Sequence, residues 1–372
     1  MPPRTLTTRE LNRTHLQRQH LLQRSHMNVG DMLSALAGLQ AQDVKDPYLA
    51  LWSRIEGFQH DHLGAMLQDR SAVRASLMRG TIHLVTAQDY PIFFPATYQL
   101  HVRAVKSVSR AHLVPREHHA AIAAQARELL EQQPLTAAQI GEAVRESWPD
   151  HEPRSLSQVV RFLLPLVQVP PRGVWGPSIS NRPAWTMPHN WLGTDVPDEV
   201  GPPHELIRRY LRTFGPASLP DITAWSGVTG LKTALADLGD ELVTYRNEVG
   251  ATLYDLTGLG IADADVPAPV RFLPGFDNAL LGHKDRSRII SDEYRRTIST
   301  QNGMFASTFL VDGLVAGMWR IADGSTELAA FGSLSRSDQE AVEHEATLVA
   351  LFWTGEPLPV RWVEVWKLPG KC

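Results

Sequence analysis

The feature that most constrains the fold is a local plan that recurs three times along the chain: helices, a short helix pair, then two strands. The middle copy is the clearest, and it predicts helices over 117–132, 137–146 and 156–164 and strands over 166–169 and 184–187. Thr136 and Ser155 precede the second and third of these helices as N-caps. This order is typical of a winged helix-turn-helix. The repeat is one of pattern, without close sequence similarity between the copies.

The other two copies follow the same plan. The third copy predicts helices over 203–214, 219–226 and 230–238 and strands over 242–245 and 252–255. The first copy predicts helices over 8–24, 29–39 and 47–54, with a bend at Asp46 because a residue before proline is biased away from helix. Two strands of alternating polarity then meet near Arg79-Gly80-Thr81, where Gly80 suits a tight turn.

The last hundred residues differ from the three copies. From about residue 267 the pattern is rich in strands, with a strand-turn-strand over 272–288 and a closing helix over 335–352. We therefore expect an α+β chain of tandem winged helix-turn-helix domains with a C-terminal β-rich segment. The expected domains are 1–115, 116–197 and 198–372.

Composition restricts the class of protein. The chain has 372 residues, of which 43% are hydrophobic and 20% charged, as in ordinary soluble proteins of several domains. No apolar run is long enough to span a bilayer, and the N-terminus lacks a secretory signal, so we expect a cytoplasmic protein without membrane contact. The single cysteine, Cys372, excludes an intramolecular disulfide and a cysteine-based zinc site. His60 and His62, and the pair His118-His119, have no further ligands nearby in sequence, so we expect no metal and no cofactor.

Charge is unevenly distributed along the chain. The net charge is −4, but residues 1–116 hold 14 Lys and Arg against 8 Asp and Glu, whereas residues 117–372 hold 22 against 32. This asymmetry is compatible with a basic DNA-facing surface on an otherwise acidic body. A modest fluctuation in composition is the alternative.

Two glutamines, Gln40 and Gln42, flank one alanine at the end of an apolar helical pattern. If the backbone extends there, residues two apart point the same way and form a neutral, doubly polar patch. Such a patch holds a water molecule or faces a developing positive charge. The alternative is that both side chains cap a helix end and are solvated.

Three segments together resemble one family. They are 36–42, with Gln40-Ala41-Gln42; 272–288, with Phe272-Leu273-Pro274-Gly275-Phe276-Asp277-Asn278; and 309–320, with Asp312-Gly313-Leu314. Their order and spacing resemble those of the AlkZ-like alkylpurine DNA glycosylases, which are bacterial tandem winged-helix proteins with a Gln-x-Gln or Gln-x-Asp motif. The resemblance covers nearly the whole chain. It implies that Gln40 and Gln42 are catalytic and that the domains form a C-shaped, concave surface for duplex DNA.

Further site residues follow from the loops of these segments. The expected DNA-binding residues are Arg79, Thr81, His83, Asn278, His283, Lys284 and Arg286. A salt-bridged loop around Asp285 is the alternative for the second group, and a buried, hydrogen-bonded side chain is the alternative for His83.

The resemblance implies a monofunctional glycosylase that hydrolyses the N-glycosidic bond of N7- or N3-alkylated purines and unhooks cross-links made through N7 of guanine. A cationic base leaves as a neutral molecule, so two amides that position water suffice. The expected partner is double-stranded DNA carrying alkylated purines, bound by a monomer without an obligatory protein partner, in DNA repair or in self-resistance to an alkylating natural product. The alternative function is a tandem winged-helix regulator of transcription without catalysis.

Overall fold

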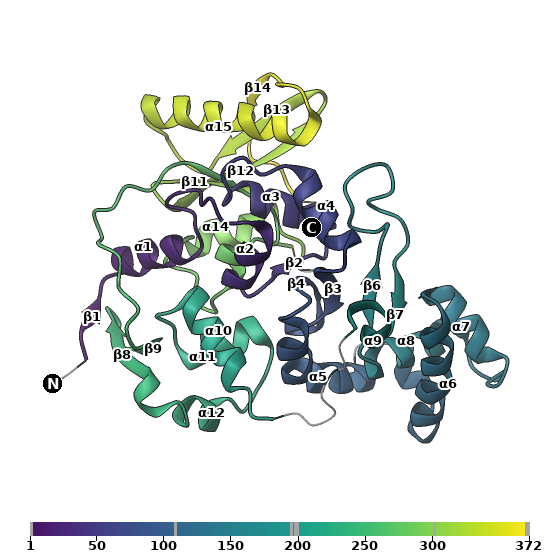
Figure 1. Ribbon diagram of the computed structural model, residues 1–372. Helices are drawn as coiled ribbons and strands as arrows, with labels where there is room; N and C mark the ends of the chain where they lie inside the picture. The colour runs from purple at the N-terminus through teal and green to yellow at the C-terminus, as the bar shows by residue number, and fades with distance from the viewer. Residues whose placement is uncertain (1–2, 108–109, 194–195, 197–200, 301–302, 369–372) are drawn as a thin grey trace.

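The computed structural model describes residues 3–107, 110–193, 196, 201–300 and 303–368, which form helices and three β-sheets (Figure 1). The expected mixed α+β class is confirmed. The expected boundary at 197/198 and Cys372 lie outside the described residues.

Most of the predicted helices are present with similar bounds, but the helices over 60–68, 90–107, 188–192, 278–281 and 292–298 were not predicted. The described α-helices are α1 (Thr8–Arg18), α2 (Val29–Ala35), α3 (Asp46–Trp52), α4 (His60–Gln68), α5 (Tyr90–Ser107), α6 (His119–Gln132), α7 (Ala137–Arg145), α8 (Pro153–Leu163), α9 (Pro188–Leu192), α10 (His204–Phe214), α11 (Leu219–Ser226), α12 (Lys232–Ala236), α13 (Asn278–Leu281), α14 (Asp292–Ile298) and α15 (Arg336–Thr354). The strands are β1 (Thr5–Leu6), β2 (Leu39–Gln40), β3 (Ala72–Ser76), β4 (Ile82–Thr86), β5 (Leu135–Thr136), β6 (Val167–Val169), β7 (Ala184–Thr186), β8 (Leu242–Asn247), β9 (Thr252–Leu256), β10 (Arg271–Leu273), β11 (Thr308–Val311), β12 (Leu314–Ala322), β13 (Ser325–Ala330) and β14 (Val360–Trp362).

A six-stranded sheet joins the first two copies of the plan. Its order is β2-β4-β3-β6-β7-β5, and the antiparallel pair β3–β6 matches Arg74 with Gln168 and Ala75 with Val167. One sheet therefore extends across the expected boundary at 115/116. The domain limits stay a prediction.

In Figure 1 the five-stranded sheet lies above the six-stranded sheet, and the three-stranded sheet lies to its left. The five-stranded sheet, in the order β10-β11-β12-β13-β14, packs with α15 at the top of Figure 1. In the three-stranded sheet, β1 pairs in parallel with β8 and so brings the N-terminus to the third copy. Helices α10 to α12 of the third copy lie at the lower left of Figure 1 and α6 to α8 of the second at the lower right.

The middle copy confirms one predicted cap and corrects the other. The Thr136 side chain accepts from the backbone N–H of Gln139, and Gln139 reaches back to Thr136, which completes a capping box. Ser155 is not a cap, because α8 begins two residues earlier at Pro153, whose fixed φ suits the first helical position. Ser155 is instead buried inside that helix.

The chain leaves α2 earlier than predicted. Ala37 and Gly38 both have positive φ, of 53° and 82°, which ends the helix and turns the backbone into β2. The expected bend at Asp46 is wrong, because Asp46 is the first residue of α3 and the following proline lies in the first helical turn, where it is tolerated. The extended stretch therefore begins at Leu39 and places Gln40 in a strand.

The predicted strand-turn-strand over 272–288 is also wrong. Strand β10 ends at Leu273, and the short helix α13 follows. The physical reason is Asp277, whose side chain accepts from the backbone N–H of Ala279 at 2.8 Å and so caps the helix.

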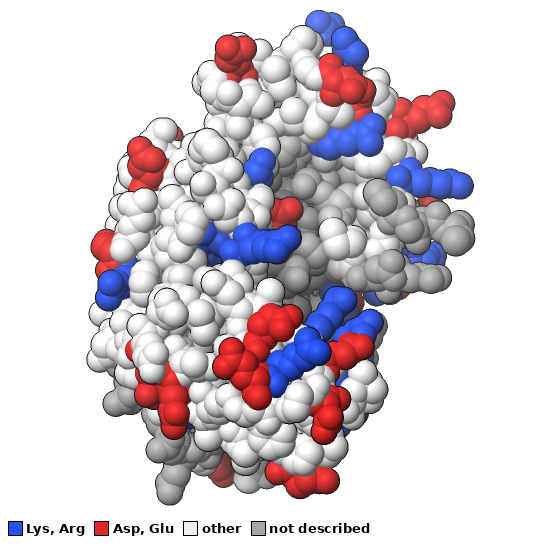
Figure 2. Space-filling view, turned by 90° about the vertical axis from the view of Figure 1, so that its right-hand side faces the viewer, with Lys and Arg blue, Asp and Glu red and all other residues white. Residues whose placement is uncertain are grey.

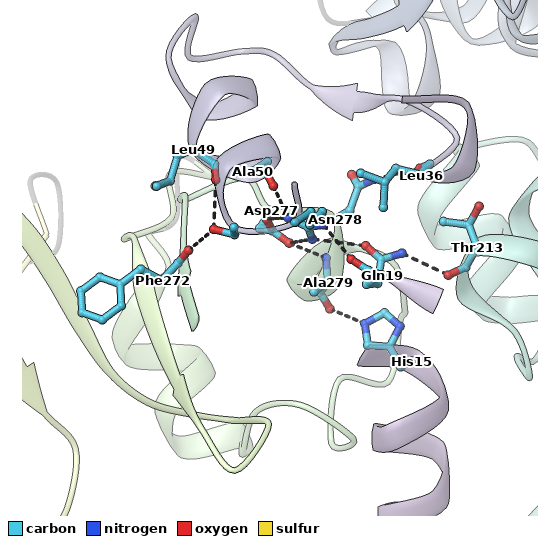
Figure 3. Close-up of polar contacts among 12 residues, drawn as sticks. His15, Gln19, Leu36, Leu49, Ala50, Thr213, Phe272, Asp277, Asn278 and Ala279 are labelled. Carbon is cyan, nitrogen blue, oxygen red and sulfur yellow. Dashed lines mark hydrogen bonds and ion pairs between the residues drawn. The ribbon is translucent and has the colours of Figure 1, made fainter. Parts of the chain in front are cut away.

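A buried ion pair ties this helix to the first copy. Asp277 Oδ1 and Oδ2 accept from Arg54 Nη2 and Nη1 at 2.7 and 2.8 Å, and both side chains are 0% exposed. The neighbouring Asn278 Nδ2 donates to the Leu36 carbonyl at 3.0 Å (Figure 3). It also donates to the Gly38 carbonyl at 2.8 Å. The α13 segment therefore fixes the backbone turn that leads into Gln40.

We expect Asp277→Asn to lower the free energy of unfolding by about 3–5 kcal/mol, because it leaves the Arg54 charge buried without its partner. Urea denaturation followed by circular dichroism measures the change. Glu340→Gln is the matched control, because it removes an exposed ion pair with Arg336 and should change stability little. A loss below about 1 kcal/mol for Asp277→Asn would contradict the assigned role of the pair.

Candidate active site

Strand β2 carries the two glutamines to the edge of the six-stranded sheet. Gln40 is paired with His83 of β4, and the backbone N–H of Ala41 donates to the Ile82 carbonyl at 2.7 Å. The extended backbone expected for this segment is therefore present. Gln40 is 6% exposed, whereas Gln42 is exposed to solvent.

Gln40 lines a cavity of about 360 Å³ whose walls come from segments far apart in the sequence. The lining residues are Gln40, Arg79, Thr81, Ala224, Phe276, Leu281, His283, Lys284, Arg286, Gly303 and Phe305. The cavity thus brings Gln40 together with the 272–288 segment, whereas Gln42 is not one of its lining residues. No Asp or Glu is present among these described lining residues.

Two phenylalanines form one wall of this cavity. The rings of Phe276 and Phe305 meet edge to face with centroids 6.0 Å apart. The Arg286 guanidinium lies over the Phe305 ring, with Cζ 5.4 Å from the centroid. The cavity therefore combines an aromatic wall with positive charge.

Arg79 binds Gln40 from inside the protein. Its Nη2 donates to Gln40 Oε1 at 2.6 Å, and its Nη1 donates to the Trp225 carbonyl at 2.5 Å. This geometry does not support the expected contact between Arg79 and a DNA phosphate, because the Arg79 guanidinium donates its hydrogen bonds to acceptors within the protein. Burial, followed by the nearby Arg286, lowers the pKa of Arg79 to about 10, so the side chain stays charged near neutral pH.

His83 completes the contacts of Arg79 as a neutral imidazole. Its Nδ1 lies 3.0 Å from the Thr81 carbonyl and must carry the hydrogen, which leaves Nε2 as the acceptor 3.4 Å from Arg79 Nη2. Burial, followed by the Arg79 charge, lowers the pKa of His83 to about 3. Of the two roles left open by the sequence, the structure gives His83 the buried, hydrogen-bonded one.

The two glutamine amides are therefore not equivalent. The carbonyl of Gln40 is engaged by a guanidinium, whereas Gln42 Oε1 accepts, from the described residues, only a long hydrogen bond of 3.4 Å from the Ile82 backbone. The sequence suggested two carbonyls with the same task, and the geometry separates their environments.

The remaining expected DNA contacts divide into buried and accessible groups. Asn278 is 4% exposed and His283 is 3% exposed, and the His283 Nε2–H donates to the Phe214 carbonyl at 3.0 Å. These two side chains point into the protein because backbone carbonyls need their N–H groups there. Thr81 is partly buried and donates to the Met78 carbonyl, whereas Lys284 is exposed and Arg286 partly exposed at the cavity.

Sequence reasoning did not single out Asp46 as an ionisable site. Asp46 Oδ2 accepts from the Phe276 backbone N–H at 3.3 Å, beside the cavity wall. Burial, followed by the charges of Asp43 and Asp277, raises the pKa of Asp46 to about 8. Nothing in the sequence around Asp46, which follows Asp43 by three residues and precedes a proline, indicates that its carboxyl group is buried.

Positive and negative side chains are interspersed over the face drawn in Figure 2, which is hollowed near its centre. Among the described residues, no group of three or more His, Cys, Asp or Glu side chains is placed to hold a metal ion. In the same part of the chain, no helix combines the length and apolarity needed to cross a membrane.

These features define a protein with a glutamine-lined cavity whose walls come from segments far apart in an α+β chain. The family model for AlkZ-like DNA glycosylases matches residues 33–352. The chain belongs to this family and is a DNA glycosylase. This result sets aside the alternative of a non-catalytic regulator.

One curated relative and one solved structure come from the same organism. The chain is 28% identical over 367 residues to an interstrand DNA cross-link repair glycosylase of Streptomyces sahachiroi, with 93% of this chain and 96% of that protein covered. It is similar to the structure of Streptomyces sahachiroi DNA glycosylase AlkZ with a TM-score of 0.79 and 25% identity, over 96% of this chain and 100% of that chain.

The Asp46 environment predicts a pH-dependent stability. In the unfolded chain this carboxyl ionises near its ordinary pKa of 3.8, but in the folded protein it ionises only near pH 8. Between these pH values the folded protein binds a proton that the unfolded chain does not. The stability that this proton contributes is therefore lost as pH rises from about 4 to 8. We expect Asp46→Asn to gain stability relative to wild type as pH rises from 5 to 8.

Urea denaturation of wild type and Asp46→Asn at pH 5, 6, 7 and 8 measures this difference. Glu128→Gln, at an exposed position on α6, is the control and should show a difference that does not change with pH. A constant stability difference between Asp46→Asn and wild type would contradict the shifted ionisation.

Proposed function

We propose that this glycosylase hydrolyses the N-glycosidic bond of cationic N7- or N3-alkylated purines in duplex DNA and has no lyase activity. The observation that carries the proposal is the composition of the cavity at Gln40. Its described lining residues include amide, hydroxyl, imidazole and cationic groups but no carboxyl group. Such a site suits a base that leaves without protonation.

The reaction fits these groups without a strong acid or base. The C1′–N9 bond breaks and its electron pair passes to the alkylated base, which departs neutral. The sugar becomes oxocarbenium-like, the oxygen of a water molecule bonds to C1′, and one water proton passes to solvent. Neutral amides and fixed dipoles lower this barrier by orienting water and stabilising charge that develops in the transition state.

The proposal extends to cross-links made through N7 of guanine. The Streptomyces sahachiroi relative is described as an interstrand cross-link repair glycosylase, and the match covers nearly both chains. A cross-linked N7 is cationic like a methylated one, so the same step releases either adduct. The role we propose is DNA repair, as general base excision or as self-resistance to an alkylating natural product.

DNA binding is proposed to involve the exposed rim of the cavity. Lys284 is exposed and Arg286 partly exposed at this rim, where phosphates are accessible to them. We infer that the three copies act as winged-helix units around a concave surface and that the protein works as a cytoplasmic monomer. We do not propose that α8 reads the bases of DNA, because its Arg161 lies over the Trp185 ring, with Cζ 4.4 Å from the ring centroid.

We expect wild type to release 7-methylguanine from duplex DNA and Gln40→Ala and Gln42→Ala each to lose about 100-fold in rate, equivalent to about 2.7 kcal/mol of barrier. Single-turnover base release measured by chromatography tests this expectation. Gln88→Ala is the control, because Gln88 is exposed and lies outside the cavity. DNA binding without release of any alkylated base by wild type would overturn the proposed substrate class.

For the rim, we expect Lys284→Ala to weaken DNA binding and to reduce the slope of log affinity against log salt by about 1, because one phosphate contact is lost. Fluorescence anisotropy at several salt concentrations measures both quantities. Lys232→Ala on α12 is the matched control, because Lys232 is equally exposed but lies away from the cavity. An unchanged slope for Lys284→Ala would exclude Lys284 from the interface.

A further inference from the structure

Arg79 is a deeply placed guanidinium whose partners are neutral. Its two terminal nitrogens meet the Gln40 side-chain carbonyl at 2.6 Å, the Trp225 backbone carbonyl at 2.5 Å and the His83 imidazole at 3.4 Å. Within the described part of the chain, no carboxylate forms an ion pair with Arg79, and the nearby charge that acts on it is the positive Arg286. A full positive charge is thus held against Gln40 without neutralisation.

The backbone at Arg79 has an unusual conformation and is held in place by a neighbouring segment. Arg79 has φ of 56° and Gly80 has φ of 68°, so two consecutive residues are left-handed. Gly227 of the third copy packs against them, because a Cβ on Gly227 would lie 3.1 Å from the Arg79 Cα atom. The residue is therefore clamped between the first and third copies.

The end of helix α11 compensates for the missing carboxylate. Trp225, whose carbonyl accepts from Arg79, lies in the last turn of α11, directly before Ser226. The carbonyls of the last helical turn carry the negative end of the helix dipole, which favours a cation. The positive charge of Arg79 is therefore stabilised by the helix end, and no carboxylate of the described residues competes with Gln40 for the guanidinium.

This contact decides what Gln40 offers to a substrate. An amide oxygen that holds a guanidinium at 2.6 Å is poorly placed to stabilise a second positive charge on the sugar. The same contact polarises the amide and strengthens its N–H groups as donors. Among the described residues, no protein acceptor is bound to Gln40 Nε2, and Gln40 lines the cavity.

We propose that Gln40 acts as a hydrogen-bond donor to the departing purine and that Arg79 is the positioning residue that fixes and polarises it. Purine ring nitrogens and the guanine carbonyl gain electron density as the C1′–N9 bond breaks, so a donor there is stronger in the transition state than in the ground state. Gln42, exposed and with only a long backbone contact on its oxygen, serves the water and the sugar. This assignment rests on the proposed hydrolysis of alkylated purines.

Two substitutions to glutamate separate a donor from an acceptor. Gln40→Glu keeps an oxygen for Arg79, and adds an ion pair, but removes both N–H donors. We expect it to stay folded and to lose about 100-fold or more in single-turnover release of 7-methylguanine. Gln42→Glu keeps acceptor oxygens where we place the attacking water. We expect its loss in the rate of base release to be at least about tenfold smaller than that of Gln40→Glu.

A double-mutant cycle tests the link to Arg79. We expect Arg79→Met to lose about tenfold or more in the rate of base release and to bind undamaged duplex with unchanged affinity and salt slope. In the Gln40→Ala background the same substitution should cost nothing further, because Arg79 acts through Gln40. Thermal unfolding of each variant identifies rate losses that come from misfolding, and Gln40→Glu, which retains a partner for Arg79, carries the test if Arg79→Met is unstable.

The outcomes separate this inference from the proposed function. If wild type releases 7-methylguanine and Gln40→Glu keeps wild-type activity, Gln40 works as an acceptor and the inference fails, while the proposed function stands. Additive losses for Arg79→Met and Gln40→Ala, or a lower salt slope for Arg79→Met, overturn the positioning role. If wild type releases no alkylated base, both proposals fail together.

Discussion

The Arg54–Asp277 ion pair is the interaction on which the rest of the site depends. It lies fully buried between α3 and the start of α13, so neither charge has water as a substitute partner. Because Asp277 is fixed, Asn278 next to it reaches the carbonyls of Leu36 and Gly38. Those carbonyls belong to the turn that ends α2 and begins β2. A charge pair from two distant segments therefore determines where the backbone delivers Gln40.

The glutamine motif places two identical amides in different surroundings. Gln40 and Gln42 are chemically identical and two residues apart, but one is held by a guanidinium and the other lies at the surface. The described lining residues include no carboxyl group, which supports the substrates we propose, because their leaving group is already activated. In the reaction we propose, selectivity for damaged bases would arise because the described lining residues include no carboxylic acid to protonate an undamaged purine.

Much of the fold was predictable from local signals in the sequence. Thr136 caps its helix as the pattern indicates, and Gly80 takes the positive φ of a tight turn. The errors occurred where tertiary contacts override local preference: the 272–288 segment is helical because Asp277 caps it while bound to Arg54. The glutamine motif was visible in sequence, but the contact from Arg79 was not, because it depends on the Trp225 carbonyl, 146 residues further along the chain.

The pairing of β3 with β6 has a consequence for any attempt to take the protein apart. Hydrogen bonds between Arg74 and Gln168 and their neighbours make the first two copies one continuous sheet. A fragment cut between them would carry a bare strand edge on each half, which invites association with other chains. A fragment meant to fold on its own must therefore keep the first two copies together.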